Sequence, residues 1–430
     1  MGLRLLIAPN EDGLGTSAWA VRLVKALVRA GGERIERILV VVASTRLADF
    51  HADKYPGLPV EVRRLENISC PVRLIKRAGG VDVPATIETA VLRYEDSRRE
   101  YIEALARAGL LAQTDLVVDL GVPQLLHAAA HSERCRALRV TFSDHAWSDT
   151  LARMAASAGL LAAEVERQLG SMRADEALAE RVFTLPEPIT PHRVERYWRQ
   201  TLGLPVERLP GVLGGPQATR AWAGGEPQAT VRRMLGIDDD APVLHLTGGG
   251  TTVWDDALSE LLDDYRARPP RYWVVVFNPI EAEKPGIRMA WKQSCQAQVA
   301  CGSDPAAPRV IFLGDVRGET HHALYAGFDL VCTRAGGGAV NDALAFRVPL
   351  VLVEEPEHVQ VEEIRRSAER LGLCRSVAWE QFRRQGRALL EDERGDLIRL
   401  PEAAAAAARI PRHAEDHLAR RLLELARETG

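Results

Sequence analysis

The chain has 430 residues, 46% of them hydrophobic, and its 55 basic and 59 acidic side chains leave a formal net charge of -4. This length predicts two or three domains with sizeable cores, and the balanced charge argues against a nucleic-acid partner. Its six cysteines form no CxxC pair, and no apolar stretch approaches the ~20 residues that cross a bilayer, so we expect a cytoplasmic protein without a transmembrane segment, for which peripheral membrane contact stays open.

Apolar strands and helical patterns alternate along the first half of the chain. We expect strands at 3–9, 37–43, 60–64, 115–120, 137–143 and 181–185, with helices at 17–29 and 85–109. Such alternation is typical of a parallel sheet covered by helices on both faces. The amino-acid composition then changes between residues 202 and 240, because 209–216 is rich in glycine and proline. We expect this segment to connect two domains.

The second half begins the same pattern again. We expect strands at 242–247, 272–277, 310–313, 329–333 and 350–353, each followed by a helical pattern, and a final amphipathic helix at 414–427. The predicted fold class is therefore α/β, with two Rossmann-like domains at 1–205 and 206–411 that face one another across a cleft. Segment 412–430 is expected to pack back towards the first domain. Clefts between domains are preferred places for small-molecule sites.

A glycine-rich turn late in the chain is the most informative motif. Gly336, Gly337 and Gly338 follow the strand expected at 329–333 and precede a helical pattern. Glycines let a pyrophosphate approach the backbone, and the N–H groups of the first helical turn point at it. Asp342, one turn into the helix, is placed to accept hydrogen bonds from ribose hydroxyls. We therefore predict a nucleotide-diphosphate site, and not an ordinary dehydrogenase, whose glycine loop usually follows the first strand.

Four residues at the carboxyl ends of first-domain strands are candidates for a general base. Glu11 and Asp12 follow the first strand, and Asp144 and His145 follow the strand at 137–143. Parallel α/β sheets place their ligands at this edge, and a carboxylate or imidazole within hydrogen-bond reach of an acceptor hydroxyl can remove its proton. By position the order of candidates is Asp12, Glu11, then Asp144 or His145. The alternative for each is a loop position that faces water.

Asp119 is an acidic residue at the end of an otherwise apolar strand. An unpaired carboxylate is costly to bury, so Asp119 either has a partner inside the fold or faces the cleft on the acceptor side. No set of His, Asp and Glu residues has the spacing of a metal site. We expect neither a metal nor a cofactor.

These features resemble the GT-B glycosyltransferases, most closely the branch of the lipid II N-acetylglucosaminyltransferase and the UDP-glycosyltransferases. The lipid II enzymes carry Arg-Ser-Gly, then Ser-Glu, then Leu-Pro. Here Arg334-Ala335-Gly336 leads through Asn341-Asp342 to Val348-Pro349 without a gap. The resemblance covers the whole chain as architecture but only short segments as sequence, and it implies a donor site on the second domain.

The resemblance also implies roles for individual residues. Asp342 would bind the ribose, and the first loop, near the acceptor, would contribute Gly13, Gly15 and Thr16. The loop after the first strand of the second domain would make a second phosphate contact. The donor-binding residues implied in this way are Gly248, Gly249, Gly250, Thr251, Arg334, Gly336, Gly337, Gly338, Asp342, His358 and Gln360.

Two departures from the family pattern leave the catalytic base and the sugar unspecified. The first loop of the family often carries a histidine, and this chain has none there. The usual Gln-x-x-Asn-Ala after the donor loop becomes Gln360-Val361-Glu362-Glu363-Ile364.

The leading interpretation is a hexosyltransferase that moves a sugar from a nucleotide-diphosphate donor to an acceptor that the sequence does not identify. Donors are most often UDP-linked in this branch, and inversion at the anomeric carbon without a metal is what the resemblance implies. Two alternatives stay open: a nucleotide-sugar epimerase or hydrolase of the same fold, and a non-catalytic nucleotide-sugar-binding subunit.

Overall fold

The computed structural model describes residues 2–12, 15–66, 68, 72–77, 80–112, 114–214, 227–248, 254–277, 290–294, 297–304, 307–317, 321–355 and 357–428. Its contacts divide the chain into two compact units. The first unit holds Met1–Ile75, Val81–Val212 and His413–Gly430, and the second holds Lys76–Gly80 and Leu213–Arg412.

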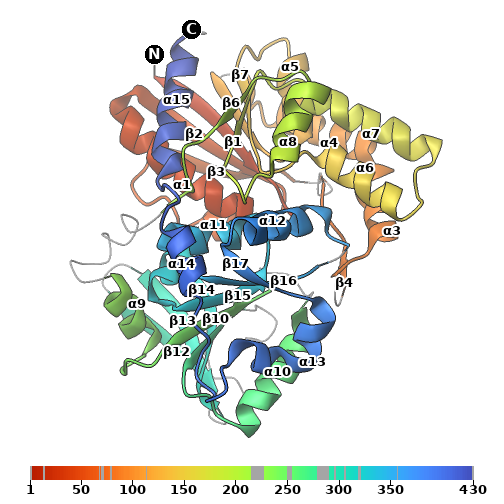
Figure 1. Ribbon diagram of the computed structural model, residues 1–430. Helices are drawn as coiled ribbons and strands as arrows, with labels where there is room; N and C mark the ends of the chain where they lie inside the picture. Colours follow the sequence, from red (N-terminus) through yellow and green to blue (C-terminus); the bar gives the residue numbers. More distant parts are fainter. Residues whose placement is uncertain are drawn as a thin grey trace. The chain divides into compact units, whose positions relative to one another are not determined.

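A parallel sheet of seven strands forms the centre of the first unit, in the order β3-β2-β1-β6-β7-β8-β9 (Figure 1). Its strands are β1 (Leu3–Pro9), β2 (Ile35–Val42), β3 (Val60–Arg64), β6 (Leu116–Leu120), β7 (Leu138–Phe142), β8 (Arg181–Thr184) and β9 (Val206–Arg208). The strand order reverses between β1 and β6, which are paired in parallel as far as Pro9 and Leu120. Loops that leave a parallel sheet at such a reversal are the usual ligand-binding loops.

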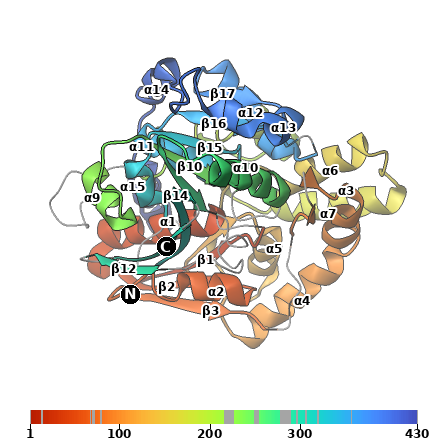
Figure 2. The same ribbon diagram turned by 90° about the horizontal axis from the view of Figure 1, so that it is seen from below.

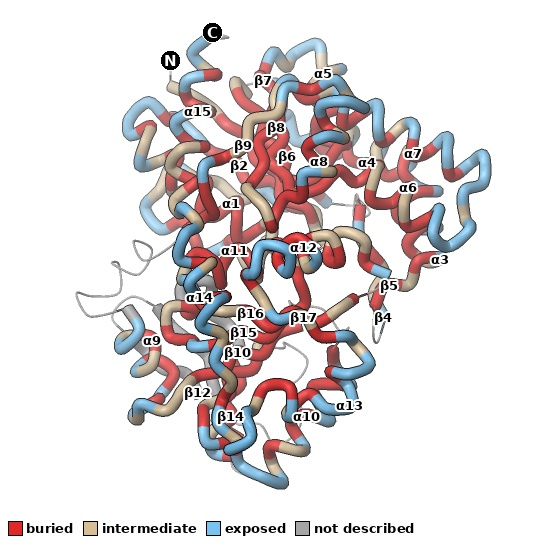
Figure 3. The backbone as a smooth tube through the Cα atoms, viewed as in Figure 1, coloured by how far each residue is buried: buried red, intermediate tan, exposed pale blue. Residues whose placement is uncertain are grey.

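Helices cover this sheet, and the central strands lie buried between them (Figure 3). All five residues of β6 are buried, which explains why that strand reads as a continuous apolar run. The helices are α1 (Gly15–Gly31), α2 (Thr45–His51), α3 (Val83–Thr86), α4 (Tyr94–Arg107), α5 (Pro123–His131), α6 (Trp147–Ser157), α7 (Ala163–Glu176), α8 (His192–Arg196) and α15 (Ala414–Glu428), with short turns η1 (Gly32–Arg34), η2 (Ile87–Val91) and η3 (Tyr197–Thr201).

The last helix of the first unit, α15, packs on α1 (Figure 1). Its apolar stripe includes Leu418 and Leu422, both fully buried. Polar contacts flank the stripe: the Arg421 Nε donates to Glu207 of β9 at 3.2 Å, and Arg29 of α1 pairs with Asp416 at 2.7 Å. An amphipathic segment that follows the whole second unit in sequence therefore completes the core of the first.

The second unit has a sheet of eight strands in the order β12-β13-β14-β11-β10-β15-β16-β17. The pairs from β14 to β17 are parallel, whereas β12 and β13 add an antiparallel edge. Its strands are β10 (Val243–Thr247), β11 (Trp273–Phe277), β12 (Ala290–Ser294), β13 (Ala297–Asp304), β14 (Ala307–Arg317), β15 (Leu330–Arg334), β16 (Leu350–Val353) and β17 (Cys374–Val377). A two-stranded ribbon, β4 (Lys76–Arg77) and β5 (Gly80–Val81), lies apart from both sheets.

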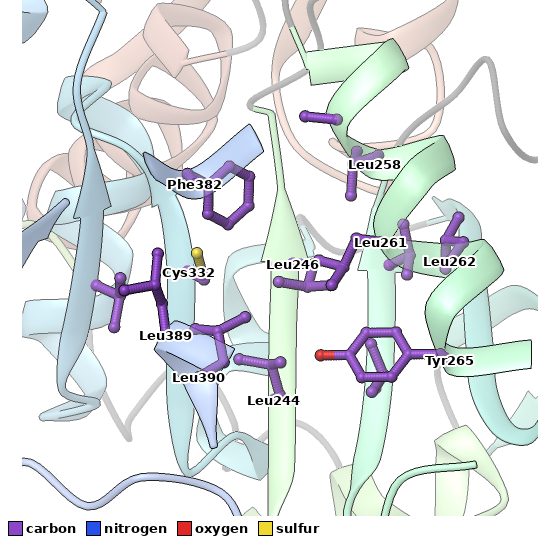
Figure 4. Close-up of a cluster of buried hydrophobic side chains, with 14 of the residues drawn as sticks. Leu244, Leu246, Leu258, Leu261, Leu262, Tyr265, Cys332, Phe382, Leu389 and Leu390 are labelled. Atoms are coloured by element: carbon purple, nitrogen blue, oxygen red, sulfur yellow. The ribbon is translucent and has the colours of Figure 1, made fainter. Parts of the chain in front are cut away.

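The helices α10 and α13 lie side by side and cover one face of this sheet (Figures 1 and 2). Figure 4 shows their apolar side chains meeting those of β10 and β15, with the free thiol of Cys332 among them. Burial raises the pKa of this thiol, which is therefore an inert core group. The helices of the second unit are α9 (Pro227–Leu235), α10 (Asp255–Ala267), α11 (Gly337–Phe346), α12 (Val359–Arg370), α13 (Trp379–Leu390) and α14 (Pro401–Ala407), with the turn η7 (His321–Gly327).

One expected element is wrong. The single helix predicted over 85–109 is broken into α3, the wider turn η2 and α4. The break lies at Arg93, whose backbone φ of −103° and ψ of 14° are not helical. Most of the sequence from 85 to 109 has high helix propensity, so the break could not be recognised from composition.

Candidate functional site

Hydrogen bonds from Asn10 connect the loop after β1 to the loop after β6. Asn10 was not among the residues predicted for the site. Its backbone N–H donates to the carbonyl of Leu120 at 3.1 Å, and its side-chain amide donates to the carbonyl of Gly121 at 2.7 Å. The Trp147 indole N–H donates to the same carbonyl at 3.1 Å. Gly121 has φ +90°, and a Cβ there would lie 3.2 Å from the Trp147 indole nitrogen. This turn therefore requires glycine.

The carboxylates of Glu11 and Asp12 hold backbone groups of neighbouring loops. Glu11 accepts from the N–H groups of Ala43 and Ser44, the latter at 3.1 Å to each carboxylate oxygen. Asp12 accepts from the N–H of Leu74 at 2.8 Å. A carboxylate occupied in this way is less available to accept a proton from a substrate, so the geometry favours a structural use of both residues.

Gly15 and Thr16 lie at the start of α1, where the Thr16 hydroxyl donates to the carbonyl of Asn10 at 2.9 Å. The predicted acceptor residue Gly13 and the predicted donor residues Gly249, Gly250 and Thr251 lie outside the described residues. Gly248 directly follows β10.

Asp119 is only 2% exposed and has partners inside the fold. Its carboxylate accepts from the N–H of Val122 and from the Thr141 hydroxyl, the latter at 3.1 Å. Burial nevertheless raises the pKa of Asp119 from its ordinary 3.8 to about 6, against the opposing effect of these hydrogen bonds. Of the two alternatives that the sequence left open, this geometry corresponds to the buried, partnered carboxylate.

The raised pKa of Asp119 predicts a pH-dependent stability. The folded state holds this proton more tightly than the unfolded chain, so the stabilisation is complete below about pH 4 and is lost as the pH rises through about 6. Asp119→Asn keeps the shape of the side chain and removes the charge. We expect the variant to be more stable than the parent at pH 8 by about 1–3 kcal/mol, and to show a flatter dependence of unfolding free energy on pH in urea titrations.

A suitable control for this experiment is Asp115→Asn, because Asp115 precedes the same strand and its side chain is 41% exposed. We expect the control to keep the pH dependence of the parent. An Asp119→Asn protein that is less stable than the parent at pH 8 would mean that the hydrogen bonds of the ionised carboxylate outweigh its burial.

Asp144 and His145 form a buried pair at the end of β7. The Nδ1 of His145 lies 2.6 Å from Oδ1 of Asp144, and the two residues are 6% and 4% exposed for His145 and Asp144 respectively. The Ser143 hydroxyl donates to the carbonyl of His145 at 2.8 Å, and the ring packs edge-on against Trp147 with centroids 4.5 Å apart. The loop therefore fixes the orientation of the imidazole.

The remaining nitrogen of His145, Nε2, has no hydrogen-bond partner among the residues that the structure describes. Burial disfavours the imidazolium, but the carboxylates of Asp144, Asp12 and Glu176 together outweigh it, and the pKa of His145 is raised above 6.5. With Nδ1–H donated to Asp144, Nε2 is left as the acceptor. Nε2 is itself buried. A carboxylate that orients an imidazole whose other nitrogen has no partner is the arrangement of a general base.

In the second unit, the glycine turn joins β15 to α11. Gly336 is the residue before the helix and makes no side-chain cap, and Gly337 and Gly338 form the first helical turn. The first N–H groups of a helix have no partner within the helix, and the helix dipole favours an anion beside them. The turn therefore has the local geometry of a phosphate cradle.

Arg334 lies beside this turn and pairs with Glu355, a residue that the sequence did not mark. Its Nη1 is 3.1 and 2.9 Å from the two carboxylate oxygens, and the side chains are 9% and 1% exposed for Arg334 and Glu355 respectively. The backbone N–H of Glu355 donates to Glu362 of α12 at 2.8 Å. This buried ion pair joins the end of β15 to the segment after β16, and so supports the glycine turn from within.

Asp342 lies in α11 and is 2% exposed, with Oδ1 accepting from the Asn341 amide at 3.2 Å. Asn341 itself pairs with both backbone groups of Leu213, at 2.9 and 3.0 Å. His358 is the residue before α12, where its Nδ1 accepts from a backbone N–H at 3.4 Å, and Gln360 is in the first turn of that helix. The predicted donor residues Asp342, His358 and Gln360 thus lie on α11 and at the start of α12.

This chain resembles known proteins in its fold but not detectably in its sequence. No family model matches the sequence, and no curated protein matches it. Solved structures do: the calicheamicin glycosyltransferase CalG4 superposes with a TM-score of 0.56 at 19% identity, covering 100% of this chain and 98% of that one. The glycosyltransferase SnogD from Streptomyces nogalater gives 0.56 at 18%, covering 99% and 100%.

The fold is GT-B. A further structure with this fold, a UDP-glucose:anthocyanidin 3-O-glucosyltransferase in complex with UDP, has a TM-score of 0.55 at 11% identity and covers 100% of this chain and 99% of that one. The predicted fold class of two α/β halves is confirmed. Among the helices that the structure describes, none is both long and apolar enough to span a bilayer.

Proposed function

We propose that this protein is a glycosyltransferase that moves a hexosyl group from a nucleotide-diphosphate sugar to an acceptor hydroxyl. The observation that carries the proposal is the β15–Gly336–α11 turn with Asp342 one turn further on. Within one GT-B unit it combines backbone N–H groups that can bind a diphosphate with Asp342, a carboxylate at 2% exposure that we assign to the ribose. The GT-B structures that superpose on the whole chain include one with UDP and one with thymidine diphosphate. UDP is the nucleotide that we propose here.

The reaction that we propose uses His145 as the general base. Nε2 takes the proton of the acceptor hydroxyl, the freed oxygen attacks the anomeric carbon, and the bond to the diphosphate breaks. Inversion at that carbon follows from a single displacement. The leaving diphosphate is stabilised by the N–H groups and dipole at the start of α11, and the imidazolium is stabilised by Asp144.

His145 is preferred over the carboxylates of the first loop because of their contacts. Glu11 is held by two backbone N–H groups and Asp12 by one. By contrast, His145 has an oriented ring, and its buried Nε2 has no hydrogen-bond partner among the described residues. The order of candidates that position alone gave is therefore reversed in our proposal.

The donor assignment predicts the effect of Asp342 on nucleotide binding. Asp342→Ala removes the carboxylate that we propose for the ribose, so we expect UDP affinity in isothermal titration to fall by about 1.5–3 kcal/mol, the usual range for hydrogen bonds to a charged acceptor. Val340→Ala is the matched control, because Val340 is a buried residue of the same helix and its apolar side chain offers no acceptor for a ribose hydroxyl. The control should lower the melting temperature and keep UDP affinity. Equal affinity of the parent and Asp342→Ala would remove Asp342 from the site.

Turnover assays decide between transfer and the alternatives. The purified protein is incubated with UDP- and thymidine-diphosphate sugars, first without and then with a panel of acceptor alcohols. Acceptor-dependent release of nucleotide diphosphate supports the proposal. Release or epimerisation without any acceptor would favour a hydrolase or epimerase, and thermal stabilisation by the nucleotide with no turnover in either arm would favour a binding subunit.

A further inference from the structure

The helix that follows His145 begins without a cap of its own. Its preceding residue is Ala146, whose side chain cannot accept a hydrogen bond. The carboxylate of Glu176, at the end of α7, takes this place. It accepts from the backbone N–H groups of Trp147 and Ser148, the latter at 3.2 Å, and from the Ser148 hydroxyl. The first turn of α6 is therefore held by a residue 28 positions further along the chain.

Glu176 is also a buried charge, at 2% exposure. Beyond its direct partners, the Ser148 hydroxyl is 2.8 Å from the Tyr197 hydroxyl, to which the Arg173 guanidinium donates at 3.2 Å. Several other charged and titratable groups lie near Glu176. Glu176 interacts electrostatically with Asp119 of β6, His145 after β7, Tyr197 of η3 and Tyr94 of α4. Arg173 of α7 acts on Tyr197. Asp12 and Asp144 act with Glu176 on the imidazole of His145.

We propose that Glu176 is a positioning residue for His145: its carboxylate anchors the start of α6, and its negative charge favours the imidazolium that forms when His145 accepts a proton. This inference rests on the general-base role proposed above. Glu176 then has two effects: it fixes the position of the loop that carries His145, and it raises the pKa of the His145 imidazole. Neither effect requires contact between Glu176 and a substrate.

The two effects are coupled through pH. Burial raises the pKa of Glu176 to about 7, against its hydrogen bonds with Ser148 and Trp147. Above that pH the carboxylate is ionised, so it accepts strongly from the α6 backbone and favours the imidazolium of His145. Below it, Glu176 becomes neutral, and both effects weaken. The charge of Glu176 thus supports the base in the range where the base must work.

The direct test measures the pKa of His145 by NMR titration of its imidazole in the full chain, with the signal assigned from a His145→Gln variant. Glu176→Gln retains a carbonyl for the Ser148 N–H and removes the charge. We expect the pKa of His145 to fall by about 0.5–1 unit, and kcat for transfer to fall about tenfold or more with unchanged UDP affinity.

Asp175→Asn is the matched control. Asp175 is adjacent and 1% exposed, but its carboxylate binds Tyr94 at 2.8 Å, Arg98 at 3.1 Å and His127 at 2.7 Å, which lie on α4 and α5. We expect this variant to lose stability and to leave the pKa of His145 in place. An equal shift in both variants, or none in folded Glu176→Gln, overturns the proposal.

A second variant keeps the test decisive if Glu176→Gln does not fold. Ser148→Ala removes a hydrogen bond that lowers the pKa of Glu176, so Glu176 should be neutral to higher pH and the pKa of His145 should fall by a smaller amount. No shift there counts against the proposal. The titration measures the pKa of His145 and does not depend on turnover. Full activity of His145→Ala would therefore reject only the general-base role of His145, and the effect of Glu176 on the pKa of His145 could still be tested.

Discussion

Replacing His145 with alanine is expected to lower kcat/KM for transfer by about 10²–10⁴-fold while UDP affinity stays the same. The reason is the geometry of the pair: Asp144 holds Nδ1 at 2.6 Å and leaves Nε2 as the only ring nitrogen that can accept a proton. Removing the ring takes away proton transfer and leaves the phosphate cradle of the second unit intact. Steady-state kinetics, with isothermal titration of UDP on the same preparations, separates these two outcomes.

The pH profile adds a second signature. The pKa of His145 is raised above 6.5, so the transfer rate of the parent protein should fall as the pH drops below this pKa. Asp144→Asn removes the main charge that raises this pKa, and we expect the acid limb of the profile to move to lower pH with a reduced plateau. Glu11→Gln is a control at the same edge of the sheet and should keep the acid limb in place. Near-normal turnover of His145→Ala on a true acceptor would mean that another group is the base.

Arg334→Ala is expected to destabilise the second unit by about 3–5 kcal/mol. The substitution leaves Glu355, which is 1% exposed, without the cation that compensates it, and breaking a buried pair from one side has this magnitude. Unfolding in urea measures the effect. In the double variant Arg334→Met, Glu355→Gln both charges are removed together, so we expect a much smaller loss of stability than in Arg334→Ala.

The same variants decide what Arg334 does at the glycine turn. If it supports the turn from within, UDP affinity should be nearly restored in the double variant, because the charges are no longer required once both are absent. If Arg334 binds the phosphates directly, as the family resemblance implies, the double variant should regain stability and still bind UDP poorly. A stable Arg334→Ala protein with weak UDP binding would contradict the supporting role.

The strands most readily predicted from sequence are those buried on both faces. β6 and β16 consist entirely of buried residues, and such runs stand out in any window. Edge strands gave a weaker signal. The edge strand β3 was predicted at 60–64 although none of its residues is buried. The edge strands β9, with only three half-buried residues, and β17, with one buried residue in four, were not predicted. An edge strand is stabilised mainly by its pairing partner, so its own residues carry little signal.

The candidate site divides in the same way. The residue types at the carboxyl ends of the strands could be read directly, and His145 was among them. What each carboxylate binds could not be read, because Glu11 finds its N–H partners 32 and 33 positions away. The roles of Asn10, Glu176 and Glu355 could not be predicted for this reason. Each role depends on hydrogen-bond or ion-pair partners that are distant in sequence, and no local sequence pattern indicates them.

The place of α15 has a consequence for synthesis. The second unit is made from 213 to 412, which is 200 residues, between the body of the first unit and the helix that completes its core. At about 5–20 residues per second, the apolar side of α1, which ends at Gly31, waits roughly 20–80 s for Leu418 and Leu422. A ribosome-bound chain should therefore pass through a stage in which the second unit can fold while the first unit still exposes the apolar surface of α1. We expect chaperone binding and aggregation during expression to occur at this stage.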